Sequence, residues 1–251
     1  FKRASPAGAP PRFLDLGAAP GGLSCFLHGD LKWSGVAVSL AVADGGMPMM
    51  YRGAKVTNSS GNAASGRPPS SIKSPFTAAK LMRAAQKPKA STAAADGGAS
   101  AGPSFAARDG DIRAETLSVM DGDTPEVAPG SCDFAMAGAV QDQSQRGDGH
   151  DAETMAALFL EQLRHRVAFL TDQLRWAHKA LRRDGTATLM LVMGPAECAS
   201  TAVVAAALAR AATDARRVRV LSTMHVDKAP IYLLAPGIRV CDPAAGDEGD
   251  D

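Results

Sequence analysis

Residues 13–22 read Phe-Leu-Asp-Leu-Gly-Ala-Ala-Pro-Gly-Gly, and they constrain the fold more than any other part of the chain. The apolar run at 12–16 is typical of a buried strand, and the glycines and proline that follow indicate a tight turn. A helix is expected next, over residues 23–28, and a second strand over residues 35–40. Strand, turn, helix and strand form a βαβ unit, which predicts a parallel sheet.

The same alternation continues in the second half of the chain. Apolar residues recur there at intervals of three or four, which predicts one long helix with a buried face. These residues are Met155, Phe159, Leu163, Val167, Leu170, Leu174, Ala177 and Leu181. The other expected elements are strands at 132–140, 186–193, 217–221 and 231–234 and a helix at 199–212. We therefore expect an α/β fold with a Rossmann-like, doubly wound, mostly parallel sheet that helices cover on both faces.

Composition predicts one folded domain with a long insertion. The 251 residues are 45% hydrophobic, enough for one sizeable core. Residues 54–108 consist mostly of Ala, Ser, Gly, Pro and Lys, with eight Lys or Arg against the single acid Asp96. We expect a disordered basic insertion there, acting either as a tether for a polyanion or as a plain low-complexity linker. The folded domain would then comprise residues 1–53 and 109–240, followed by an acidic tail at 241–251.

The cysteines and the hydropathy exclude several classes of protein. Cys25, Cys132, Cys198 and Cys241 are widely scattered, with no CxxC pair and no histidine at ligand spacing. Neither a zinc site nor a disulfide framework is therefore expected, and no other metal site is predicted. No run of about 18 apolar residues is present to cross a bilayer. We expect a soluble, intracellular protein.

The Gly-rich turn is the best candidate for a binding site. In a parallel α/β sheet, ligands bind outside the carboxyl ends of the strands, where the first turn must approach them closely. Gly17, Gly21 and Gly22 would allow that approach, and Pro20 would stiffen the turn. Asp15 would organise the turn or orient an ammonium group of a cofactor. The alternative is a tight turn in a structural domain, and the absence of Gly-x-Gly-x-x-Gly argues against a dinucleotide.

The whole string at 13–22 closely resembles the first motif of FtsJ-like RNA methyltransferases. Residues 35–40, followed by Asp44-Gly45-Gly46, are similar to the second motif of the fungal-type branch of that family. Residues 172–186 resemble its late helix-to-strand passage, and residues 231–235 resemble its last strand. The resemblance implies the class I methyltransferase fold, S-adenosylmethionine as cofactor and RNA as substrate, methylated on a ribose 2′-oxygen.

The resemblance also assigns cofactor contacts. The residues concerned are Asp15, Gly17, Ala19, Pro20, Gly21, Gly22, Ser39 and Asp111. Ser39 stands where the family usually has a ribose-binding acid, and its hydroxyl would replace that carboxylate with less charge assistance. Asp111 would offer a carboxylate to the adenine amino group.

The catalytic part of the resemblance is incomplete. The family uses a Lys-Asp-Lys-Glu tetrad, in which a lysine helps to deprotonate the ribose hydroxyl. The aspartate should follow the strand that begins after Asp133, but Gly138 and Ala139 are found there. The second lysine should lie within or just after residues 186–193, which contain no lysine. Lys2 and Lys228 are the remaining candidates for a catalytic base.

Three classes of function follow, ranked with the first two close together. They are an active RNA or small-molecule methyltransferase, a catalytically silent FtsJ-like domain that binds RNA or assembles with other components, and another Rossmann-type binding protein. RNA would be held by the basic insertion and by an arginine-rich helix face through phosphate contacts. The cations of that face are Arg164, Arg166, Arg175, Lys179, Arg182 and Arg183.

Overall fold

The computed structural model describes residues 9–51, 54–55, 102–139, 152–193, 199–222 and 231–240. The catalytic candidates Lys2 and Lys228, most of the predicted insertion and the predicted acidic tail lie outside these ranges. No helix in the described ranges has the length and apolar character needed to cross a membrane.

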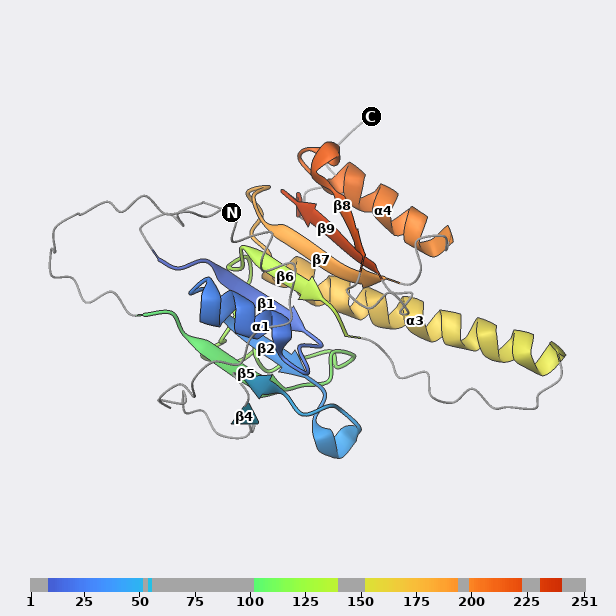
Figure 1. Ribbon diagram of the computed structural model, residues 1–251, viewed down its shortest axis with the longest axis horizontal. Helices are drawn as coiled ribbons and strands as arrows, with labels where there is room; N and C mark the ends of the chain where they lie inside the picture. The colour runs from blue at the N-terminus through green and yellow to red at the C-terminus, as the bar shows by residue number, and fades with distance from the viewer. Residues whose placement is uncertain are drawn as a thin grey trace, which may run out of the picture.

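The described residues form a seven-stranded sheet with the order β5-β2-β1-β6-β7-β9-β8 (Figure 1). Neighbouring strands are parallel from β5 through to β7, and β9 is antiparallel to both β7 and β8. The strands are β1 (Arg12–Leu16), β2 (Ser34–Ser39), β5 (Phe105–Asp109), β6 (Phe134–Ala137), β7 (Thr188–Met193), β8 (Arg219–Ser222) and β9 (Ile231–Pro236). The predicted α/β fold with a mostly parallel, Rossmann-like sheet is confirmed.

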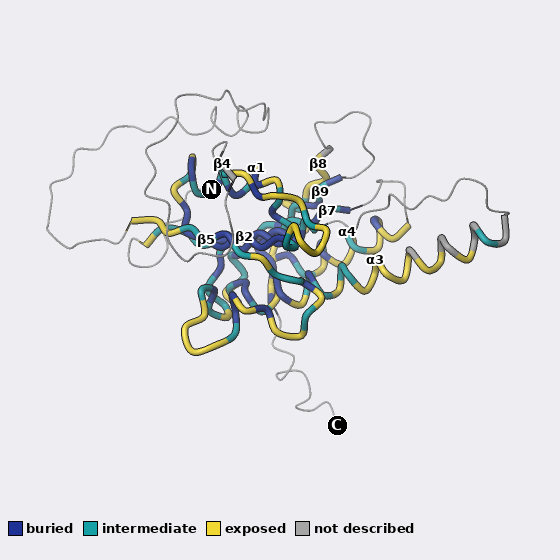
Figure 2. Tube along the Cα trace, turned by 90° about the horizontal axis from the view of Figure 1, so that it is seen from below, coloured by how far each residue is buried: buried dark blue, intermediate teal, exposed yellow. Residues whose placement is uncertain are grey.

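Helices lie on both faces of this sheet, as Figure 2 shows. One face carries the short helix α1 (Gly22–Ser24) and the π-helical segment η2 (Cys25–Asp30), where Leu27 packs against Phe13 and Phe134. The opposite face carries α3 (Ala152–Ala180) and α4 (Ala199–Ala211). The alternation of side chains along each strand supplies an apolar surface to both faces, so neither face is left without a core.

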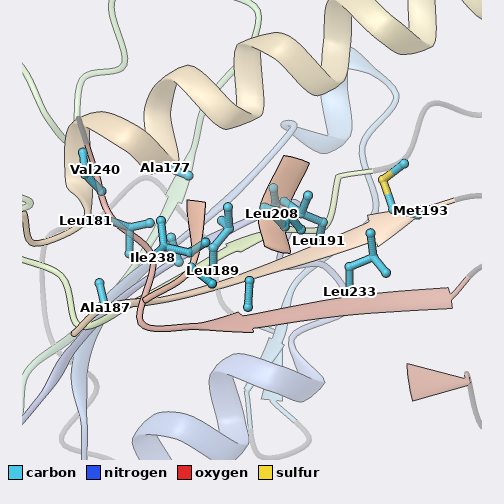
Figure 3. Packing of buried hydrophobic residues seen from close by; sticks show 14 of the residues in the cluster. Ala177, Leu181, Ala187, Leu189, Leu191, Met193, Leu208, Leu233, Ile238 and Val240 are labelled. Atoms are coloured by element: carbon cyan, nitrogen blue, oxygen red, sulfur yellow. The ribbon is translucent and has the colours of Figure 1, made fainter. Parts of the chain in front are cut away.

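The core under α3 and α4 is built from alternate residues of β7 and β9 (Figure 3). Leu191 and Leu233 are fully buried there, against Leu208 of α4 and Leu181 just beyond α3. Further along the same face, Trp176 of α3 is buried and donates its indole N–H to the Ile112 carbonyl at 2.9 Å. The second half of α3 is therefore fixed to the sheet.

The first half of α3 departs from the prediction. The sequence pattern places Leu163 and Val167 on a buried face, yet both side chains are exposed. Leu170 and Leu174, in contrast, pack against the core. The apolar stripe is thus longer than the sheet, and its first turns extend beyond the surface that could cover them.

The predicted insertion also needs correction at both ends. Ala54–Lys55 form β4, which pairs with β3 (Met50–Tyr51) in a small antiparallel sheet. At the other end, β5 (Phe105–Asp109) is not disordered but pairs in parallel with β2, with Ala107 buried. Backbone pairing to β2 orders this edge strand, and the Phe105 ring stacks on Phe13. Residues 56–101 lie outside the described ranges.

Candidate functional site

The Gly-rich turn lies at the point where the sheet reverses its strand order. After β1 the chain builds β2 and β5 on one side, and then crosses to place β6 on the other side of β1. The turn is held to β2 because Gly17 and Ala18 both donate to the Val38 carbonyl, at 2.9 and 3.0 Å. Such a switch point, at the carboxyl ends of parallel strands, is where open α/β sheets bind ligands.

Gly17 is required by the packing of the chain itself. Its φ is +78°, and a Cβ atom built there would lie 2.2 Å from the Cα atom of Ala139. Ala139 follows β6, and the neighbouring Gly138 donates to the Leu16 carbonyl at 2.9 Å. The glycine lets the carboxyl ends of β1 and β6 meet. Packing within the chain therefore requires glycine at this position, whether or not a cofactor contacts it.

Gly21 has a similar structural role. Its φ is +102°, and a Cβ atom there would lie 2.3 Å from the Met50 carbonyl oxygen. Met50 also donates its N–H to the Pro20 carbonyl at 2.9 Å, so residues 49–50 lie directly against the turn. A bulkier residue at Gly21 would clash with this segment, so lost ligand affinity in such a variant would not locate a cofactor.

The sequence does not predict the contact between residues 49–50 and the turn. Met49 is buried in a small cluster with Ala18, Ala37 and Ala107, on the same face of the sheet as α1. The string Met-Pro-Met-Met at 47–50 has no periodic pattern that would predict a buried side chain at Met49. The outer surface of the turn stays accessible, since Pro20 and Gly22 are exposed and Gly17 and Ala19 are half-buried.

Asp15 is buried beneath the turn with 2% of its surface exposed. The Ser24 hydroxyl of α1 donates to its Oδ2 at 2.6 Å, tying the first helix to β1. Burial raises the pKa of Asp15 to about 6, although the Ser24 hydrogen bond opposes the rise. Of the two predicted roles for Asp15, organising the turn is the one its contacts support.

This raised pKa should make stability depend on pH. An unfolded aspartate ionises near pH 4, whereas the folded Asp15 keeps its proton up to about pH 6. The wild-type free energy of unfolding should therefore fall as pH rises between these values, by about 3 kcal/mol relative to Asp15→Asn. Urea unfolding of both proteins from pH 3.5 to 7.5 measures the difference. Asp44→Asn, at an exposed aspartate, serves as the control, and parallel curves for wild type and Asp15→Asn would refute the assignment.

Ser39 and Asp111 lie at the same edge of the sheet. Ser39 is buried at the end of β2, and its carbonyl accepts a hydrogen bond from Gly110 at 2.9 Å. Arg113 donates from Nε and from a terminal nitrogen to the two carboxylate oxygens of Asp111, each at 2.9 Å, and this holds the pKa of Asp111 below its usual value. An adenine amino group would have to share those oxygens with Arg113.

Ala139 lies after β6, where the FtsJ-like family has its catalytic aspartate, and its backbone groups are hydrogen-bonded to the Gln173 side chain. The Gln173 side chain accepts from the Ala139 N–H at 2.9 Å and donates to the Ala139 carbonyl at 3.1 Å. Gln173 belongs to the helix passage whose sequence resembles the family. Asp133 lies at the opposite end of β6, where it accepts from the Arg12 N–H at 2.8 Å and from Arg182 at 3.1 Å. These contacts give Asp133 a structural role.

The described residues form neither a catalytic pair of Ser24 and His28 nor a cluster of metal ligands. Ser24 donates to Asp15, while His28 Nδ1 lies 2.8 Å from the Trp33 carbonyl oxygen, so these two side chains do not form a nucleophile and base pair. The His28 ring instead stacks on Phe105, with centroids 5.2 Å apart. Within the described ranges, no three His, Cys, Asp or Glu residues gather as metal ligands.

The predicted basic face of the long helix is divided into two parts. In the second half, Lys179 pairs with Asp121, and Arg175 pairs with Asp172 at 3.4 Å and lies over the Trp176 ring. These two cations therefore make contacts within the chain that hold a loop and the helix in place. Arg164 and Arg166 in the first half are exposed.

No protein-family model and no curated protein sequence matches this chain. The features that bear on function are therefore the carboxyl edge of the sheet and residues 13–22.

Proposed function

We propose that this chain is an S-adenosylmethionine-dependent methyltransferase domain of the FtsJ-like type that acts on RNA, with a ribose 2′-oxygen as the acceptor. One observation carries the proposal: the segment that resembles the family's first motif forms β1, a tight turn and α1 at the switch point of the sheet. The mostly parallel sheet, with β9 antiparallel between β7 and β8, supports the class I methyltransferase fold that the resemblance implies.

The accessible part of the turn suits such a cofactor. Gly17, Ala19, Pro20 and Gly22 would hold it by backbone and van der Waals contact, while the buried Asp15 would act through Ser24 and α1. When bound, S-adenosylmethionine supplies a methyl group on a sulfonium centre. Ser39 and Asp111, at the ends of β2 and just beyond β5, lie at the edge where the ribose and the adenine would be recognised.

A catalytically silent domain is the second candidate, and the surroundings of Ala139 favour it. A family member would present a carboxylate after β6, whereas this chain has Gly138 and Ala139, with both backbone groups of Ala139 engaged by Gln173. β7 carries no lysine either. Such a domain would keep the cofactor turn and bind RNA without transferring the methyl group.

Calorimetric titration tests the cofactor assignment. The chain should bind S-adenosylmethionine, and also its demethylated product S-adenosylhomocysteine, with an affinity in the micromolar range, about −8 kcal/mol. NAD should not bind, because the turn lacks the dinucleotide pattern. Binding of NAD in preference to both methyl-donor compounds would place the chain among other Rossmann-type proteins and refute the proposal.

A further inference from the structure

The first half of α3 projects beyond the carboxyl edge of the sheet. Gln173 contacts Ala139 just after β6, whereas Leu181 pairs with Cys132 just before β6, so α3 runs opposite to the strands. The helix begins at Ala152, far ahead of Gln173. Phe169 and Leu170 already pack on the core, so the projecting part is residues 152–168, which at about 1.5 Å per residue is about 25 Å long. Figure 1 shows α3 extending past the strand arrowheads, and Figure 2 shows this part as largely exposed.

This projection continues the apolar seam that the sheet covers further along. Seven apolar residues follow one another at alternating steps of three and four, the spacing of a coiled-coil seam. They are Leu160, Leu163, Val167, Leu170, Leu174, Ala177 and Leu181. The last four pack on the core, whereas Leu160, Leu163 and Val167 are 54%, 38% and 55% exposed. A seam of this kind is half of a helix-to-helix interface.

The charges beside the exposed seam have one sign. In the heptad that contains the seam, Arg164 and Arg166 occupy the two positions that flank it, where partner helices place complementary charges. No hydrogen bond or ion pair joins either arginine to another residue of the described ranges. Glu161 and His165 lie away from the seam and contact each other, at 3.6 Å. The seam is therefore edged by cations alone.

We propose that Leu160, Leu163 and Val167, flanked by Arg164 and Arg166, form a docking site for an amphipathic helix of another protein whose apolar face is edged by Asp or Glu. A second copy of this chain fits less well. The antiparallel register that sets Leu163 against Val167 would face each arginine with its own equivalent, and like charges there oppose association. The bound helix would lie beside the carboxyl edge of the sheet, whether or not that edge transfers methyl groups.

A synthetic helix tests this site directly. The probe is a fluorescent three-heptad peptide with leucine along its seam and glutamate at both flanking positions, and its matched control carries lysine in place of glutamate. Fluorescence anisotropy with the full chain should show the glutamate peptide binding at least about tenfold more tightly, with an affinity that falls as salt rises. Arg164→Glu combined with Arg166→Glu should reverse that preference.

Substituting the apolar side chains of the seam measures their contribution to binding apart from that of the two arginines. Leu163→Gln with Val167→Gln should weaken binding of the glutamate peptide by about tenfold or more. Val203→Gln, at a valine on α4 that is 66% exposed, should leave binding unchanged. The thermal stability of the chain alone should not change in either variant, since these side chains are exposed.

Four results would overturn the proposal. Equal binding of the two peptides, or no binding, would show that the site does not select an apolar helix edged by acidic residues. A melting temperature lowered by several degrees in the double glutamine variant would show that this chain covers its own seam. A dimer in sedimentation that the same variant abolishes would assign the seam to a second copy. A single-stranded RNA that displaces the peptide and requires both arginines would assign them to RNA.

Discussion

Gly17→Ala should destabilise the protein far more than Gly45→Ala, although both glycines have a positive φ, at +78° and +87°. A side chain at either position incurs the backbone strain of the left-handed region, about 1 kcal/mol. At Gly45 the new Cβ atom meets nothing within 4 Å, whereas at Gly17 it would lie 2.2 Å from the Ala139 backbone. Separating the ends of β1 and β6 should add about 1 to 3 kcal/mol.

The measurement is urea unfolding of the two variants and the wild type, followed by circular dichroism. Gly17→Ala should lose several kcal/mol, a large part of the 5 to about 15 kcal/mol typical of a domain, or should fail to fold. Gly45→Ala should lose about 1 kcal/mol. Equal losses in the two variants would mean that β1 and β6 do not meet at Gly17, and the geometry assigned to the switch point would be wrong.

Methyl transfer to RNA should be slow, and undetectable transfer would favour the catalytically silent alternative. The position after β6 has no carboxylate, and β7 has no lysine to accept the proton of a ribose hydroxyl. General acid and base assistance is typically worth about 10²- to 10⁴-fold in rate, or roughly 3 to 5 kcal/mol of barrier. Positioning of the cofactor and the RNA would supply what rate remains.

A single-turnover assay with radiolabelled S-adenosylmethionine on capped and uncapped RNA measures this rate. We expect little labelled RNA over hours, and Lys2→Ala and Lys228→Ala should not lower the amount further. Turnover at the rates of ordinary enzymes, about 1 per second or faster, would contradict the prediction. If either lysine variant then abolished that turnover, it would identify a substitute base.

The sequence predicts those parts of the fold where local pattern and burial agree. β1 was predicted with the bounds it has, because a short apolar run followed by a glycine turn has few other solutions. The long helix was also predicted, since its apolar spacing extends over many turns. The exposed position of Leu163 could not be read from that spacing, because a helical pattern does not reveal where the covering sheet ends.

Elements fixed by tertiary contacts escaped prediction. β5 is held by backbone pairing to β2 and by the Phe105 ring, which stacks on Phe13, and one aromatic residue in Phe105–Asp109 is too short a pattern to predict a strand. Within the candidate site, Gly17 and Gly21 were identified correctly as special positions, but the groups that approach them are Ala139 and Met50 of the same chain. A glycine in the sequence can indicate that other atoms come close to the backbone, but it does not identify those atoms.

A methyl-donor cofactor should bind on the outer surface of the turn after β1, as proposed above. Amide hydrogen exchange of the full chain with and without saturating S-adenosylhomocysteine tests it most directly, because the unreactive product reports position without chemistry. Added protection should concentrate in residues 17–24 and 39–41 and around Asp111, with α4 and β8 unchanged. Protection confined to other parts of the chain, or none at saturating ligand, would contradict the account.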